Sequence, residues 1–281
     1  MLEIIDKGIF TTIQDNGRNQ LRDAGIPVGG AMDGHAFRLA NHLLGNPENE
    51  AAIEFMYKGP TIKFHRATTI TLTGADFNPK LNDQSIRNGT RVKVKPGDVL
   101  QTGSTRDGVY GYLGVSGGFL LSPKFNSRSY YPEICNDSLL KNGRKVHYFG
   151  RLISSNQHAK VGRYSPKYEK NALDVYKGPE FKNLPAEQQQ ILTEKEFKIS
   201  SSSNRMSVQL EHDYNLGIKD ILTAPVQPGV VQLTPAGKLI VLMQDAQTTG
   251  GYARVFILSE EAQHILAQKR PHSNVKFNSV N

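Results

Sequence analysis

Short stretches of alternating apolar and polar residues, separated by turn-forming residues, make up most of the chain. Residues 68–73 alternate β-branched and apolar side chains, and residues 91–95 alternate charge with valine ahead of a Pro-Gly-Asp turn. Residues 109–115 are similar, and each of these segments is predicted to be a strand with one buried face. Residues 238–243 are almost continuously apolar, which predicts a strand in the centre of a sheet. The pattern predicts a mainly β protein with few helices.

Two segments have helical spacing instead. Residues 36–44 and 260–268 each place their apolar side chains on one helical face. The first helix is predicted to follow an N-cap at Asp33 and to end before Gly45, where Gly-Asn-Pro is a strong stop signal. We expect both helices to be short and to cap the β structure.

A change in composition suggests how the chain is divided. Between about residues 153 and 171 the sequence becomes polar and basic with little hydrophobic period. We interpret this segment as a linker or long loop between an N-terminal β-rich subdomain, 1–152, and a C-terminal one, 172–281, unless the two halves share a barrel. A length of 281 residues with 38% hydrophobic content is sufficient for one large or two ordinary domains.

Composition also limits the partners. No apolar run approaches the roughly 18 residues of a membrane span, and the N-terminus has no signal-peptide pattern, so we expect a cytoplasmic protein without a membrane partner. The net charge of +8 comes from Lys and Arg spread over both halves, with a mild excess in the middle. We interpret it as a solvated basic face and expect no nucleic-acid partner, although attraction for an anionic substrate or acidic partner would look the same.

Cysteine and histidine give no sign of a metal site. Cys135 is the single cysteine, so it cannot form an internal disulfide, and we interpret it as incidental. Eight histidines occur without metal-binding spacing, and there is no Gly-x-Ser-x-Gly motif for a nucleophile. We expect no tightly bound metal, although magnesium arriving with ATP needs only one or two carboxylates.

The first candidate cluster lies on a glycine turn after a predicted strand. Residues 11–18 bring together the amide of Gln14, the carboxylate of Asp15 and the guanidinium of Arg18, a set that can orient a small polar substrate. Asp15 paired with Arg18 would stay ionised, or Arg18 could bind a substrate carboxylate or phosphate through two hydrogen bonds. The alternative is an Asp-Asn-Gly turn beside a surface arginine.

The second candidate is the glycine-rich loop at residues 24–33, which leads into the first predicted helix. Such a loop can present backbone N–H groups to an anion, but its spacing fits neither a P-loop nor a dinucleotide-binding motif. Ordinary loop packing is the alternative.

The third candidate, residues 244–252, directly follows the apolar strand. Five polar side chains and two glycines at the end of a buried strand are hard to explain by packing, because buried polar groups need partners. Asp245 can act as a general base or orient an amine, and Thr248 and Thr249 can donate to a carbonyl or phosphoryl oxygen. Gly250 and Gly251 would let the backbone approach a ligand. The alternative is a polar hairpin turn before a strand that begins at Tyr252.

Together, motifs along nearly the whole chain resemble the family variously called 5-oxoprolinase C subunit, allophanate hydrolase subunit 2, biotin-dependent carboxyltransferase and KipA-like. The motifs that carry the resemblance are Thr11–Arg18, Gly25–Pro27, Gly30–Asp33, Ala40-Asn41, Gly45–Pro47, Ala52–Glu54, Gly59-Pro60, Thr73–Asp76, Ser116–Phe119, Ser127–Ser129, Gly178-Pro179, Asn204–Met206, Pro228-Gly229 with Gln232, and Asp245–Tyr252.

The resemblance implies a mainly β fold with a few short helices and two cyclophilin-like β-barrel subdomains. It implies that the chain is one component of an ATP-dependent 5-oxoprolinase, which opens 5-oxoproline to glutamate. The site would be shared with a KipI-like partner of the B type. A third component would be an A-type protein similar to LamB/YcsF. ATP with magnesium would act in the assembled complex. Two alternatives stay open: a carboxyltransferase that uses carboxybiotin on a partner and acts on urea or a similar small amide, and a non-catalytic KipA-like antagonist of a histidine-kinase inhibitor.

Site residues follow from the clusters and the resemblance together. We expect Asp15 and Asp245 to be catalytic. The expected substrate-binding residues are Gln14, Arg18, Asp33, Asn41, Glu54, Gln247, Thr248, Thr249, Gly250, Gly251 and Tyr252. In the enzyme hypothesis the 245–252 loop converges on one site with Gln14, Asp15, Arg18 and Asp33.

The chain also departs from the family pattern. Ala246 and Gln209 replace two arginines, Ala253 replaces a proline, and Tyr130 replaces a threonine. If those arginines hold an anionic substrate, this protein has an altered substrate or is retained for binding.

Overall fold

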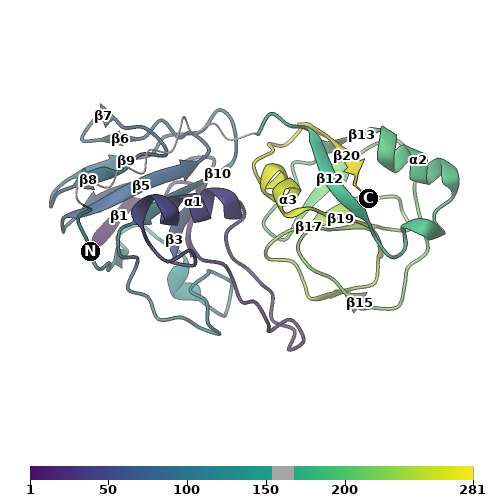
Figure 1. Cartoon of the computed structure of the whole chain (residues 1–281), viewed down its shortest axis with the longest axis horizontal. Helices are drawn as coiled ribbons and strands as arrows, with labels where there is room; N and C mark the ends of the chain where they lie inside the picture. Colours follow the sequence, from purple (N-terminus) through teal and green to yellow (C-terminus); the bar gives the residue numbers. More distant parts are fainter. Residues whose placement is uncertain (154–167, 281) are drawn as a thin grey trace. The chain divides into compact units, whose positions relative to one another are not determined.

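The computed structural model describes residues 1–153 and 168–280, which form two compact units (Figure 1). Unit 1 contains residues 1–18 and 29–153 of the described chain, and unit 2 contains residues 19–28 and 168–280. The linker predicted at 153–171 lies mostly in 154–167, outside the described residues. The division at 152 and 172 therefore stays a prediction.

Unit 1 is built from two antiparallel sheets. The first has the order β11 (Lys145–Val146), β1 (Leu2–Asp6), β4 (Thr61–Phe64), β9 (Val99–Gln101), β6 (Lys80–Leu81) and β7 (Gln84–Ser85). The second has the order β2 (Phe10–Gln14), β3 (Ala52–Met56), β10 (Tyr110–Val115), β5 (Thr68–Gly74) and β8 (Val92–Val94).

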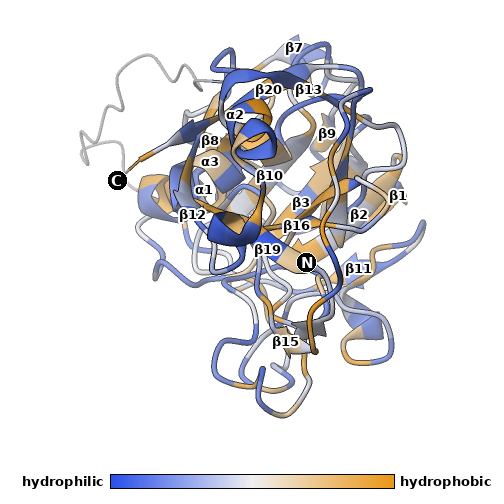
Figure 2. Cartoon of the chain, turned by 90° about the vertical axis from the view of Figure 1, so that its right-hand side faces the viewer, coloured by the Kyte–Doolittle hydropathy of each residue, from blue (hydrophilic) through white to orange (hydrophobic). Residues whose placement is uncertain are grey.

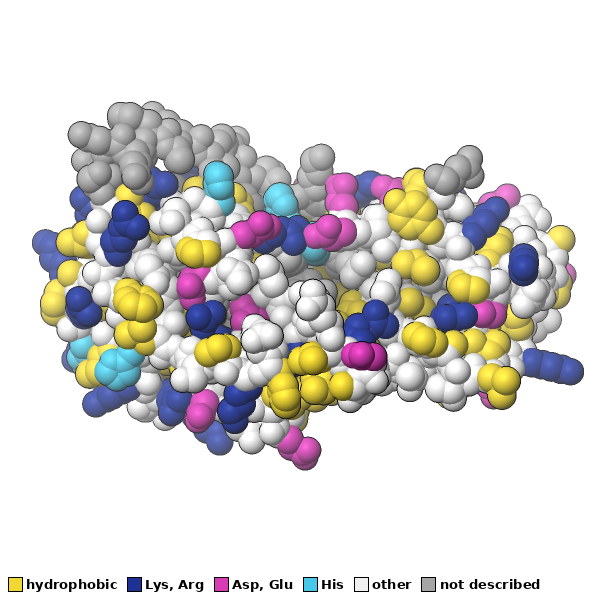
Figure 3. Space-filling view, turned by 60° about the horizontal axis from the view of Figure 1, so that its bottom comes forward, with side chains coloured by type: hydrophobic (Ala, Val, Ile, Leu, Met, Phe, Trp, Pro, Cys, Tyr) yellow, Lys and Arg dark blue, Asp and Glu magenta, His cyan; other side chains and the backbone are white. Residues whose placement is uncertain are grey.

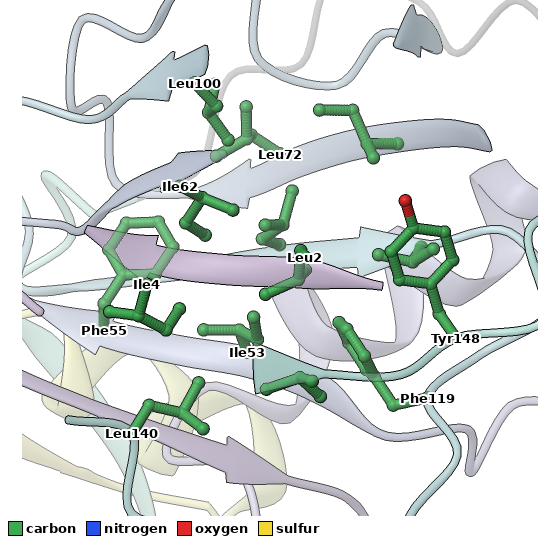
Figure 4. Packing of buried hydrophobic residues seen from close by; sticks show 14 of the residues in the cluster. Leu2, Ile4, Ile53, Phe55, Ile62, Leu72, Leu100, Phe119, Leu140 and Tyr148 are labelled. Carbon is green, nitrogen blue, oxygen red and sulfur yellow. The ribbon is translucent and has the colours of Figure 1, made fainter. Parts of the chain in front are cut away.

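An apolar core joins the two sheets of unit 1. Leu2 and Ile4 from β1 pack in one cluster with Ile53 and Phe55 from β3, and all four are at most 1% exposed (Figure 4). Every second residue of a strand points to the same face, so these side chains define the inner face of each sheet. The side chains on the outer face of the second sheet point away from this core.

Helix α1 (Gly34–Leu44) packs against β5 and β10 of the second sheet. Asp33 caps it by accepting a hydrogen bond from the Ala36 N–H at 3.0 Å, and Gly45 ends it in the left-handed conformation at φ 62°, which confirms both predicted helix boundaries. The prediction of one buried face is wrong for β5 and β10, because every residue in both strands is buried. One face of each strand meets the core, and α1 covers the other.

Unit 2 contains a closed barrel of seven strands. Their order is β12 (Ala172–Lys177), β19 (Ala253–Leu258), β16 (Val230–Leu233), β17 (Leu239–Leu242), β14 (Ser207–Glu211), β13 (Glu196–Ile199) and β20 (Asn274–Ser279). The parallel pair β12 and β20 closes the ring. The predicted apolar strand is β17, and it lies between β14 and β16. Figure 2 shows apolar colouring along β16 and β19.

Short elements complete unit 2. Strands β15 (Ala224–Pro225) and β18 (Thr249–Gly250) pair as a two-stranded ribbon. Helix α3 (Glu260–Ala267) confirms the second predicted helix, and Ser259 caps it. Helix α2 (Ala186–Glu194) was missed because its sequence is largely polar and only Leu192 is buried. Short 3-10 turns lie at η1 (Asn136–Ser138) in unit 1 and η2 (Phe181–Asn183) in unit 2.

The mainly β fold class with few helices is confirmed, with three α helices in the described residues. Within that same part of the chain, no helix has both the length and the apolar character needed to cross a membrane. On the face drawn in Figure 3, basic side chains are interspersed with acidic ones and do not form one patch.

Candidate functional site

A row of polar residues crosses the outer face of the second sheet in unit 1. The register pairs Thr12 of β2 with Glu54 of β3, Glu54 with Tyr112 of β10, and Tyr112 with Thr73 of β5. All four side chains are at most 2% exposed. Because neighbouring residues such as Ile13 and Ile53 point into the apolar core, this row must lie on the opposite face, on the side of α1.

Glu54 connects this row to the start of α1. Its Oε2 accepts hydrogen bonds from the Met32 N–H and the Tyr112 hydroxyl, both at 2.8 Å. The Tyr112 oxygen in turn accepts from the Asp33 N–H at 2.8 Å. Burial, together with the nearby Glu54 and Asp33 carboxylates, raises the pKa of Tyr112 well above its usual value. Tyr112 therefore keeps its proton and donates a hydrogen bond to Glu54.

The Asp15 carboxylate is surrounded by donors from residues 127–129. Oδ1 accepts from the hydroxyls of Ser127 and Ser129, each at 2.6 Å, and from the Gly17 N–H at 2.9 Å. Oδ2 accepts from the Arg128 N–H at 2.6 Å, and Asp15 is only 4% exposed. The expected pairing of Asp15 with Arg18 is not found among the ion pairs of the described residues.

Arg18 is fully buried instead of lying on the surface. Its Nη2 donates to the carbonyl oxygen of Ser129, while Nε and Nη1 have no hydrogen-bond partner. Gln14 is also fully buried, and its Nε2 donates to the Thr12 hydroxyl at 3.0 Å while Oε1 has no partner. Unit 1 thus holds three buried polar atoms without a partner on two residues of the first candidate cluster, Gln14 and Arg18.

The rest of the predicted unit 1 residues have structural contacts. Asn41 donates to the carbonyl oxygens of Glu48 and Glu50 at 3.2 and 2.7 Å, which holds the segment after α1 in place. In the glycine-rich loop, a Cβ on Gly30 would lie 3.0 Å from the Asp15 carbonyl oxygen, and its φ is 94°. This close approach explains the glycine by loop packing.

In unit 2, Asp245 forms a two-point ion pair. Its two carboxylate oxygens accept from Nε and Nη2 of Arg205, both at 2.8 Å. Glu180 and Arg254 form a second such pair at 3.0 and 2.8 Å, and the hydrogen bonds from Arg254 lower the pKa of Glu180. Both pairs are mostly buried.

The loop after Asp245 is more open. Gln247 and Thr249 are exposed, Thr248 is half-buried, and Tyr252 is 40% exposed. A Cβ on Gly250 would come within 2.6 Å of Nε2 of Gln232, an atom that is buried and has no hydrogen-bond partner. The Gly251 carbonyl oxygen accepts from the Ile221 N–H at 2.9 Å, which ties the loop to the β15 side of the ribbon.

The structure therefore brings together Gln14, Asp15 and Arg18 in one part of unit 1, and Glu54 and Asp33 in a linked network. Asp245 to Tyr252 belong to unit 2, and their convergence with the unit 1 residues stays a prediction. Sequence reasoning missed the partners Ser127, Ser129, Tyr112 and Arg205. Three of these four lie in motifs of the family resemblance, which was the available signal; Tyr112 lies only in a predicted strand.

One groove of unit 2 does not coincide with these residues. It has a volume of about 590 Å³, is lined by His212, Tyr214, Lys238 and their neighbours, and includes none of the predicted site residues. No group of three or more His, Cys, Asp and Glu side chains within residues 1–153 and 168–280 is arranged to hold a metal ion.

Comparison with known proteins places the chain among enzyme components. It is 33% identical over 291 residues to the C subunit of 5-oxoprolinase from Haemophilus influenzae, covering 100% of this chain and 91% of that protein. The Escherichia coli protein of the same name is 33% identical over 280 residues, covering 95% and 87%. Urea amidolyase of Saccharomyces cerevisiae is 41% identical over 118 residues, which is 42% of this chain and 6% of that protein.

Solved structures have the same fold. The crystal structure of TTHA0988 matches with a TM-score of 0.89 and 27% identity, covering 99% of this chain and 56% of that one, so this chain spans about half of its length. The Kluyveromyces lactis urea carboxylase matches with a TM-score of 0.88 over 100% of this chain and 27% of that one. At 23% identity this second match shows the fold alone. Residues 24–279 match the family model described as carboxyltransferase domain, subdomain A and B, and the chain therefore belongs to that family.

Proposed function

We propose that this chain is the C subunit of an ATP-dependent 5-oxoprolinase, which opens 5-oxoproline to glutamate. The observation that carries the proposal is the extent of the match to two 5-oxoprolinase C subunits, which covers 91% and 87% of their lengths at 33% identity. Matches to urea amidolyases reach 38% and 41% identity but cover only 45% and 42% of this chain.

The proposed enzyme is a complex. A C-type component implies others, and we propose a KipI-like protein of the B type that shares the site, together with an A-type protein. ATP with magnesium enters as a co-substrate of the assembled complex. In this complex the polar residues of unit 1 and the 245–252 loop bind the substrate.

We assign Asp15 and Asp245 to positioning instead of proton transfer. Four donors already occupy the Asp15 carboxylate, and Arg205 holds both oxygens of Asp245. A carboxylate has about four lone-pair sites, so the four donors leave Asp15 little capacity to remove a proton, and the two-point pair with Arg205 fixes the orientation of Asp245. In the proposed reaction Asp15 holds residues 127–129 against the end of β2, and Asp245 fixes the start of the 245–252 loop.

Co-expression with the A-type and B-type proteins tests the proposal. We expect the three proteins to co-purify and to release glutamate from 5-oxoproline only when ATP is present. The matched controls are the same preparation without this chain and the full complex without ATP. A complete complex that consumes no 5-oxoproline contradicts the proposal.

A carboxyltransferase role is the second candidate, favoured by the local 41% identity to urea amidolyase. The same complex is then supplied with urea, ATP, bicarbonate and a biotinylated carrier protein. Carboxylation of urea without glutamate release supports this second candidate. Stable association without turnover of either substrate instead supports a role in binding alone.

A further inference from the structure

Arg18 is a fully buried cation without a counter-ion among the described residues. Its guanidinium donates once, to the Ser129 carbonyl oxygen, and two of its three nitrogens have no partner. Arginine stays protonated in proteins, so burial cannot neutralise it as it can neutralise lysine. Because an unpaired buried charge is strongly unfavourable, this guanidinium requires an anion.

The carboxylate nearest to Arg18 in sequence does not supply that anion. Asp15 lies three positions before Arg18, yet its oxygens accept from Ser127, Ser129, Gly17 and Arg128. Those neutral donors stabilise the Asp15 charge without using Arg18. The guanidinium is therefore left with donor capacity for a group that the chain does not provide.

Gln14 adds a second unpaired group of a different kind. One end of its carboxamide is bonded to Thr12, and the other end has no partner although the side chain is fully buried. A carboxamide pairs well with another amide, because each presents both a donor and an acceptor. The two residues together match a ligand with an anionic group beside an amide.

We infer that Arg18 and Gln14 form a subsite for a small amide that carries a carboxylate, with Arg18 binding the carboxylate and Gln14 the amide. This inference rests on the proposed function and specifies its substrate class. In 5-oxoproline the carboxylate is attached to the carbon next to the ring nitrogen, so both groups are present within one small molecule. Urea has no anionic group and leaves the Arg18 charge unpaired.

The test measures binding to the purified complex by calorimetry without ATP, so that no turnover is needed. The probes are 5-oxoproline, the neutral lactam pyrrolidinone and urea. We expect wild type to bind 5-oxoproline on the order of 100-fold more tightly than pyrrolidinone, the scale of a charge-assisted two-point contact. Equal affinity for the two lactams overturns the inference.

Variants then assign the contact to Arg18. We expect Arg18→Met to lose this preference while its affinity for pyrrolidinone is unchanged, and Arg18→Lys to keep part of it. Gln14→Met should weaken both lactams by a similar factor. Arg144→Met, which removes a 40% exposed arginine of unit 1, is the matched control and should bind both lactams like wild type. An Arg18→Met complex that binds 5-oxoproline like wild type overturns the inference.

The outcome can be separated from that of the proposed function. If the wild-type complex releases glutamate and the Arg18→Met complex has the same KM for 5-oxoproline, the proposed function is supported and the Arg18 subsite is contradicted. If the complex prefers 5-oxoproline over pyrrolidinone through Arg18 but releases no glutamate, the subsite is supported and the proposed function is contradicted. If Arg18→Met does not fold, the Arg18→Lys variant and the wild-type preference between the lactams decide.

Discussion

The two units treat their buried arginines in opposite ways. In unit 2, Arg205 and Arg254 each donate two hydrogen bonds to a single carboxylate, that of Asp245 or Glu180. In unit 1, Arg18 is more deeply buried than either, yet it donates only to a carbonyl oxygen. A closed ion pair has its hydrogen-bonding capacity satisfied and can only support the fold, whereas an unmatched guanidinium still has capacity for a ligand.

The carboxylates differ in the same way. Asp245 and Glu180 are neutralised by arginine, while Asp15 is stabilised by hydroxyls and backbone N–H groups. Unit 1 therefore separates a negative and a positive group that are close in sequence. The neutral donors around Asp15 are what leave Arg18 available to a ligand.

Replacing Asp15 should have the largest effect on stability. Asp15→Asn replaces one carboxylate oxygen, which accepts hydrogen bonds, by an amide NH2 group, which donates them. At least one of the donors from Ser127, Ser129 and Arg128 therefore loses its acceptor. Each unsatisfied buried donor costs about 1–3 kcal/mol, and losing the charge weakens the remaining bonds, so we expect a loss of about 3 kcal/mol or more. Urea unfolding of the purified chain measures it.

Asp137→Asn is the control for this variant. The Asp137 side chain is 83% exposed, so its unfolding free energy should stay close to that of wild type. A loss below about 1 kcal/mol for Asp15→Asn would show that the cage around Asp15 is not what organises residues 127–129.

Opening the Arg205 pair should cost somewhat less. Arg205→Met leaves the Asp245 carboxylate mostly buried without its cation, and removing one partner of a buried pair is costly. Because Asp245 retains 14% exposure, we expect a loss of about 2–3 kcal/mol in the unfolding free energy. The double variant Arg205→Met with Asp245→Leu should recover most of it, and a double variant no more stable than the single one contradicts this account.

The local part of the fold could be predicted from sequence. The N-cap at Asp33 and the stop at Gly45 depend on residues within one turn of the helix, and both are confirmed. The full burial of β5 was missed because it depends on α1, which packs on β5 from far earlier in the chain. A sequence pattern shows only whether apolar and polar side chains alternate along a strand. The threonines of β5 that face α1 give the same alternation as polar side chains that face water.

The candidate site was predicted less completely for the same reason. Gln14, Asp15 and Arg18 were found because they lie within five residues of sequence, and the nearest opposite charge suggested an ion pair. The actual partners of Asp15, Ser127 and Ser129, lie 112 and 114 residues away in the chain. Only the fold brings them to Asp15, so the spare donor capacity of Arg18 could not be derived from spacing.

The ion pair between Arg254 and Glu180 should contribute less to the unfolding free energy than the Arg205 pair, and its contribution should depend on pH. Arg254 lowers the pKa of Glu180 in the folded state, so the pair stabilises the fold above the unfolded pKa of Glu180, and this stability is lost as the pH falls through the folded value. Because Arg254 is 20% exposed and Arg205 only 8%, water screens this pair more, and Arg254→Met should cost about 1–2 kcal/mol near neutral pH and progressively less below the usual value of 4.5. Urea unfolding at several pH values measures this, and an equal cost at every pH would contradict it.

The smallest effect on stability is expected at Arg18, which bears most directly on the contrast between the units. Arg18→Met removes one hydrogen bond to Ser129 but also removes a buried charge that has no counter-ion in the described residues. The two terms oppose each other, so without ligand we expect the unfolding free energy to change by less than about 1 kcal/mol, or to rise. Urea unfolding beside Arg205→Met measures the contrast. If both variants lose about 2–3 kcal/mol, Arg18 has a structural counter-ion and the two units use arginine alike. If only Arg205→Met loses this much, the charge of Arg18 contributes little to the stability of the fold, and its counter-ion must be a ligand from outside the chain.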